Sequence, residues 1–158
     1  MPAKAVVSDT SPLIALAAIG SFHLLGEVYE SVHVPASVLR ELRAGEVDGV
    51  AVPAPEWLRI EEDAPARDRR LLYDLDDGEA QAILLARNLM LPLLMDEKRG
   101  RRVAEHLQVA VSGTVGFLAR CRREDRIPSF REYASRLRSA GVHLTDRLVD
   151  LVAAELGE

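Results

Sequence analysis

Short apolar runs alternate along this chain with longer segments of helical periodicity, and this alternation constrains the fold most. The runs that we interpret as strands are residues 5–7, 32–34, 57–60, 91–95 and 109–111. Residues 91–95 are apolar throughout, as expected of a strand that is buried on both faces. Strands that alternate with helices form a parallel sheet covered by helices, so the sequence predicts an α/β fold.

Recognisable signals begin the helical segments. Thr10 supplies a hydroxyl cap two residues before a proline, Ser129 and Glu132 have the spacing of a capping box, and Thr145 begins the last helix. The clearest signal is Asp76-Asp77-Gly78-Glu79. Helices are also predicted over residues 22–29, 36–45, 97–106 and 115–123, whereas the charged residues 63–70 are predicted to form an exposed connection.

With 158 residues, the chain has the length of one domain, and residues 127–158 are predicted to form its C-terminal helical extension. A single cysteine excludes a disulfide framework and a cysteine-based zinc site. The first apolar stretch, residues 12–19, is too short to span a bilayer, which takes about 20 residues. It follows an aspartate where a signal peptide would carry basic residues. We therefore expect a cytoplasmic protein without a membrane partner.

Acidic residues gather where the predicted strands end. Asp9 and Asp96 each follow a strand directly, and the carboxyl ends of parallel strands form the ligand-binding edge of such sheets. Glu41 and Glu79 lie on the apolar sides of their helices. Helix capping would explain Asp9, Asp96 or Glu79 taken singly, but it does not explain Glu41 in the middle of a helix.

Four carboxylates at one edge repel each other, at about 4 kcal/mol for a pair 4 Å apart with an effective dielectric near 20. Either some are protonated or a cation holds them together. Oxygen-rich coordination of this kind suits Mg²⁺ or Mn²⁺.

Several segments, in this order, resemble PIN-domain proteins, and most of all the VapC-type toxins of type II toxin–antitoxin pairs. These segments are SDTSPLIAL, VPASVLREL, LDDGEAQAILLA, LLMDEKRGRRVAE and VSGTVGFLAR, within residues 5–125. The resemblance implies a three-layer α/β/α sandwich with a short, mainly parallel sheet. It also implies an Mg²⁺- or Mn²⁺-dependent ribonuclease.

The same resemblance implies roles for individual residues and for partners. The acidic quartet of the family falls on Asp9, Glu41, Glu79 and Asp96, with Asp9 and Asp96 binding metal directly. Glu97 is a possible further acid, and Thr114 or Ser112 fits a hydroxyl that recurs near the last strand. A cognate antitoxin and a homodimer are expected from the habit of the family.

Charge is distributed unevenly, although the net charge is −5. Residues 98–126 hold 8 basic and 3 acidic residues, a net charge of +5. Arg99, Arg101 and Arg102 begin the helix after Asp96 and are our candidates for phosphate contacts, although Arg99 could instead pair with an acid of the quartet. The basic segment is the part of the chain that an RNA backbone would meet.

Other functions remain open at this point. A phosphatase of the HAD type would carry a second Asp where Ser11 stands, and a response-regulator receiver would carry an acidic neighbour of Asp9 and a lysine after a late strand. A catalytically silent PIN-like module that binds RNA or a protein is the alternative from a different class.

Overall fold

The computed structural model describes residues 4–45 and 49–158. Its sheet has five parallel strands in the order β3-β2-β1-β4-β5. Their bounds are β1 (Ala5–Ser8), β2 (Ser31–Pro35), β3 (Leu58–Glu61), β4 (Leu93–Leu94) and β5 (Val111–Ser112). The predicted parallel sheet and its five strands are confirmed, although β4 is shorter than predicted and β5 begins two residues later.

Helices follow the strands as the alternation predicts. Their bounds are α1 (Thr10–Ala18), α2 (His23–Val28), α3 (Ala36–Gly45), α4 (Ala66–Arg69), α5 (Asp77–Leu89), α6 (Lys98–His106), α7 (Thr114–Arg123), α8 (Phe130–Ser139) and α9 (Asp146–Glu155). Residues 63–70, predicted to form an exposed connection, include α4 and the start of a 3₁₀ turn (Arg70–Leu72), and no residue of α4 is buried. The Arg69 guanidinium holds this segment by donating to the carbonyls of Leu72 and Leu75.

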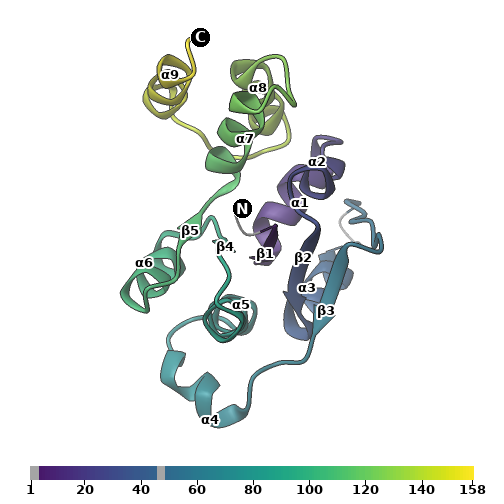
Figure 1. The fold of residues 1–158 in the computed structure, drawn as a ribbon, viewed down its shortest axis with the longest axis vertical. Helices are drawn as coiled ribbons and strands as arrows, with labels where there is room; N and C mark the ends of the chain where they lie inside the picture. The colour runs from purple at the N-terminus through teal and green to yellow at the C-terminus, as the bar shows by residue number, and fades with distance from the viewer. Residues whose placement is uncertain (1–3, 46–48) are drawn as a thin grey trace.

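Consecutive valines of β1 belong to different hydrophobic clusters, which makes the molecule three-layered. Val6 is buried with side chains of α1, α2, α3 and α7, whereas Val7 is buried with side chains of α5 and α6. Because successive strand residues point to opposite faces, both faces of the sheet are covered by helices. The predicted α/β/α sandwich is therefore what the structure shows (Figure 1).

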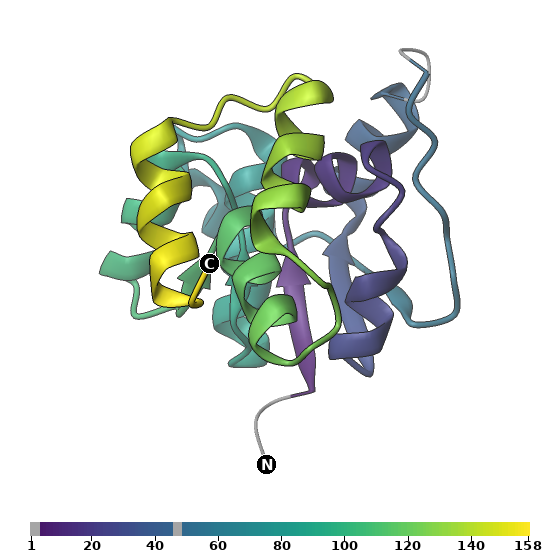
Figure 2. The same ribbon diagram turned by 90° about the horizontal axis from the view of Figure 1, so that it is seen from above.

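Residues 127–158 contain α8 and α9, which lie beside α7 at one end of the molecule (Figures 1 and 2). Phe130 and Leu137 are fully buried in the same cluster as Val6. The C-terminal helices thus share the main core of the domain. No helix within the described ranges is long and apolar enough to cross a membrane.

The strand order reverses direction between β1 and β4. From β1 the chain proceeds outward to β2 and β3, and it then returns to add β4 and β5 on the other side of β1. In open parallel sheets, ligands bind at the carboxyl ends of the strands that flank such a switch point. Asp9 and Asp96 are the residues that follow these two strands closely.

Candidate active site

Asp9 lies at the end of the central strand, where it is almost completely buried. Its exposed fraction is 4%, and its backbone N–H donates to the carbonyl of Leu94 on β4 over 2.9 Å. Asp9 occupies the N-cap position of α1, but its side chain accepts no capping hydrogen bond. Helix capping therefore does not explain this carboxylate.

The charge of the Asp9 side chain is compensated only in part. Within the described part of the chain, its Oδ1 atom is buried and has no hydrogen-bond partner. Burial raises the pKa of Asp9 to about 7 against the opposing N–H of Thr10, and the charges of Glu41, Asp76 and Asp96 add to the rise. A buried anion that is short of donors needs a proton or a cation.

Glu41 is held by donors from two other helices. The Thr10 hydroxyl donates to its Oε2 over 2.5 Å, and the Gly78 N–H at the start of α5 donates to its Oε1 over 3.1 Å. Gly78 leaves room for this contact, because a Cβ at that position would overlap the Glu41 carboxylate. Glu41 thus binds the N-terminus of a helix 37 residues further along the chain, which the sequence did not indicate.

Glu79 lies on the first turn of α5 and is half-buried. Burial and the adjacent Asp76 carboxylate raise its pKa to about 7, with smaller contributions from Asp9 and Glu97. Asp76 caps α5 by accepting from the Glu79 N–H over 2.9 Å, as the capping signal predicts. Asp76 is also a member of the acidic group, because its charge acts on both Asp9 and Glu79. The sequence pattern predicts only its role as the helix cap.

Asp96 is oriented by the start of α7. The N–H and the hydroxyl of Thr114 donate to its two carboxylate oxygens, both over 2.7 Å. A Cβ on Gly113 would lie 2.6 Å from Asp96 Oδ1, so this contact requires glycine there. Of the two hydroxyls predicted near the last strand, Thr114 is buried against Asp96, whereas Ser112 is exposed.

The remaining predicted residues surround α6. Glu97 caps this helix by accepting from the Arg99 N–H over 3.2 Å, and it is exposed. Arg99 pairs with Asp74 at 2.9 Å rather than with an acid of the quartet. Arg101 is half-buried and borders Gly113, and Arg102 is exposed.

The acidic group fits a hydrated divalent cation. As arranged, no set of three or more His, Cys, Asp or Glu side chains in the described ranges is close enough to hold a metal ion directly. Mg²⁺ keeps several of its waters and is commonly bound through one or two carboxylates. The unpartnered Asp9 Oδ1 supplies such a ligand, with the charges of Glu41, Asp76 and Asp96 acting on it.

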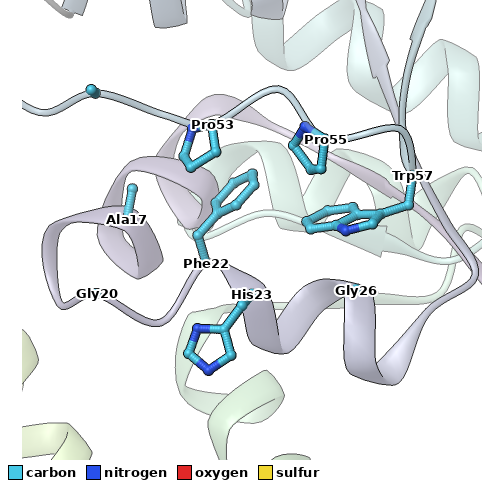
Figure 3. A pocket seen from close by; sticks show the side chains of 9 residues that line it. Ala17, Gly20, Phe22, His23, Gly26, Pro53, Pro55 and Trp57 are labelled. Atoms are coloured by element: carbon cyan, nitrogen blue, oxygen red, sulfur yellow. The ribbon is translucent and has the colours of Figure 1, made fainter.

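A separate hollow of about 400 Å³ differs from the acidic group in the residues that line it. It lies between α2 and the segment before β3, where Phe22 stacks on Trp57 at 5.3 Å beside Pro53 and Pro55 (Figure 3). Its described lining includes no Asp, Glu, Lys or Arg. His23 is its one titratable lining group within the described residues, so this hollow lacks the carboxylates of the acidic group.

Comparison with known proteins gives one family match and one structural neighbour. The model of a family described as a PIN domain matches residues 5–158. A solved structure of a PilT N-terminus domain protein from the hyperthermophilic archaeon Sulfolobus solfataricus P2 is 15% identical, with a TM-score of 0.44. That alignment covers 89% of this chain and 96% of the archaeal one. A search of curated proteins gave no significant match.

Proposed function

The chain belongs to the PIN-domain family, whose members are typically nucleases, and we propose that it is a metal-dependent endoribonuclease. The observation that carries the proposal is the buried, unpartnered carboxylate of Asp9 at the switch point of the sheet. Asp96 follows the neighbouring strand, and basic residues of α6 begin two positions later. A cation site beside a basic helix suits the hydrolysis of a phosphodiester bond.

Each acidic residue has a distinct place in this proposal. Asp9 and Asp96 would hold Mg²⁺ or Mn²⁺, which would supply Lewis-acid activation of water and of the phosphate. Thr114 fixes the orientation of Asp96 through two hydrogen bonds. Glu41 is held by Thr10 and Gly78, and together with Glu79 it would orient water around the cation.

Cleavage of a panel of RNAs with Mn²⁺, Mg²⁺ or EDTA tests the proposal. Asp9→Asn and Asp96→Asn should each lower the rate at least about 100-fold, since loss of a group that only hydrogen-bonds a metal ligand already costs about 10–100-fold. Asp125→Asn is the matched control, because Asp125 is exposed at the end of α7 with a positive φ that asparagine tolerates.

Undiminished cleavage by both site variants would contradict the assignment of the acids. Failure of the wild-type chain to cleave any RNA, together with no Mn²⁺ binding by calorimetry, would favour the silent PIN-like module.

We further propose that the protein is a VapC-like toxin of the cytoplasm, restrained by a cognate antitoxin and assembled as a homodimer. The support is the ordered set of sequence segments given above. A small neighbouring reading frame whose product co-purifies with this chain and blocks cleavage is the expected result. Light scattering that gives the monomer mass at micromolar concentration would contradict the dimer.

A further inference from the structure

A cleft of about 460 Å³ lies next to Asp96, where α6 and the start of α7 meet the C-terminal helices. Lys98 and Arg101 of α6 contribute cationic groups to its lining. The segment between α8 and α9 contributes Val142 and Leu144, and α9 contributes Leu148. The volume lies within the roughly 300–1,000 Å³ of small-molecule sites.

The cations of this cleft are available to a ligand. Neither Lys98 nor Arg101 has an ion-pair partner within the described ranges, in contrast to Arg99, which is engaged with Asp74. Lys98, Arg101 and Arg102 are spaced i, i+3 and i+4, so they share one side of α6. A shallower hollow lined by these three residues and Glu105 continues from the cleft along the helix. Together the two hollows form a cationic path that begins at Asp96.

The apolar part of the cleft is unusual because it is open to water. Leu148 is 40% exposed at the first turn of α9, and Val142 and Leu144 are only half-buried. The exposed His143 also lines the cleft, with a ring that can meet the edge of a base. A free phosphate would use the cations and leave this apolar surface bare, whereas a nucleotide carries both an anionic group and a flat, weakly polar base.

We propose that this cleft is a subsite for one unpaired nucleotide of the RNA substrate, next to the scissile phosphate. The proposal rests on the proposed function. Lys98 and Arg101 hold the phosphate of that nucleotide, while its base lies against Val142, Leu144 and Leu148. The C-terminal segment therefore takes part in choosing where the RNA is cut.

Binding without cleavage tests the subsite first. Fluorescence anisotropy in EDTA measures the affinity of the full chain for labelled rA, rU, rC and rG hexamers. Leu148→Glu should weaken the tightest of these complexes about tenfold. Leu151→Glu is its matched control, since Leu151 is 56% exposed one turn further along α9 and does not line the cleft.

A second pair of variants tests the cationic side chains of the cleft. The double variant Lys98→Gln/Arg101→Gln should reduce the slope of the salt dependence of binding by about 0.7, the value for one phosphate of a single strand. The control Arg87→Gln/Arg123→Gln removes two exposed cations away from the cleft. Mapping the cut positions with Mn²⁺ should then show that His143→Ala and Leu148→Glu shift the preferred nucleotide.

The outcomes separate this inference from the proposed function. Cleavage by the wild-type chain with identical binding and cut positions for Leu148→Glu and Leu151→Glu would overturn the subsite alone. Selective loss of binding in Leu148→Glu without any cleavage by the wild-type chain would support the subsite and overturn the ribonuclease. A wild-type chain that neither binds nor cleaves RNA would overturn both. A circular-dichroism melt of each variant verifies its folding, and the exposed His143→Ala gives the answer if Leu148→Glu unfolds.

Discussion

Two carboxylates, Asp9 at the end of β1 and Glu158 beyond α9, are both largely buried but differ in what surrounds them. The Glu158 side chain is 14% exposed and accepts from the Phe130 N–H over 2.7 Å, from the Ser129 hydroxyl over 2.8 Å and from the Arg122 guanidinium over 3.2 Å. Although burial acts in the opposite direction, these donors hold the pKa of Glu158 below its usual value. The Oδ1 atom of Asp9 has no such donor in the described chain.

The difference lies in how far the fold compensates each carboxylate. Glu158 joins the end of α9 to the start of α8 and to α7, so its charge contributes to packing of the C-terminal helices. Asp9 is buried at an electrostatic cost that the Thr10 N–H offsets only in part. Under the proposed function, the fold satisfies Glu158 with its own donors and leaves Asp9 for a cation.

The largest expected effect concerns stability without metal. The folded pKa of Asp9, about 7, exceeds the unfolded value of 3.8. The electrostatic cost of burying this carboxylate is therefore absent below pH 3.8, grows as the pH rises from 3.8 to about 7, and is complete above pH 7. Asp9→Asn removes this cost and should raise the free energy of unfolding at pH 8 by up to about 4 kcal/mol. Urea unfolding in EDTA at pH 8 and pH 4.5 measures it, and the gain should shrink at the lower pH.

Divalent cations should narrow this difference in stability between the wild-type chain and Asp9→Asn. A ligand that binds only the folded state at 100 times its Kd stabilises by about 2.7 kcal/mol. Mn²⁺ should therefore raise the Tm of the wild-type chain and leave that of Asp9→Asn almost unchanged. Equal shifts in both proteins would show that Asp9 is not a ligand.

Glu158→Gln should lower the stability of the chain, in contrast to Asp9→Asn. Loss of charge-assisted bonds to Phe130 and Ser129 should lower the free energy of unfolding by about 2 kcal/mol at pH 7. Because the folded pKa lies below the unfolded 4.5, this contribution is present above pH 4.5 and is lost as the pH falls. Chemical denaturation from pH 7 to pH 3 checks the trend; an effect that grows toward acid would contradict it.

The smallest expected effect tests whether the hydrogen bonds of Glu41 contribute to stability, as those of Glu158 do. Gly78→Ala should destabilise by about 1 kcal/mol, since the new Cβ would displace Glu41 from the N-terminus of α5. Gly116→Ala is the control, because its Cβ would meet only Ser112 Cβ at 3.5 Å on a helix. That change should stabilise by roughly 0.5–1 kcal/mol, the usual gain of alanine over glycine in a helix. A stabilised Gly78→Ala would mean that the Glu41 contact is dispensable.

The local pattern of the sequence predicted the strands and most helices because both sheet faces are apolar and α5, α8 and α9 begin with side-chain caps. The predicted Thr10 cap is wrong, since the Thr10 hydroxyl donates to Glu41 and α1 has no side-chain cap. The short α4 was missed because three of its four residues, Ala66–Arg69, are charged and the segment has no apolar periodicity. Its stability comes from Arg69, which contacts Leu72, Leu75 and Asp77. Such contacts of one side chain are not encoded in a hydropathy pattern.

The acids at the strand ends were identifiable because each follows an apolar run or lies on an apolar helix side. The hydrogen-bond partners of these acids could not be predicted, because they depend on contacts between segments that are distant in the sequence. Gly78 is 37 residues from Glu41, and Thr114 is 18 residues from Asp96. Lys98 was counted among the basic residues but was not singled out, because its lack of a partner is a property of the folded chain.

The central position of β1 in the sheet also determines when its two neighbouring strands become available during translation. β1 can pair with β2 early in translation, but its other edge has no partner until residues 93–94 have been made. Asp96, and Thr114 which orients it, are made later still. Under the proposed function, a nascent chain therefore lacks a complete nuclease while most of it is being translated.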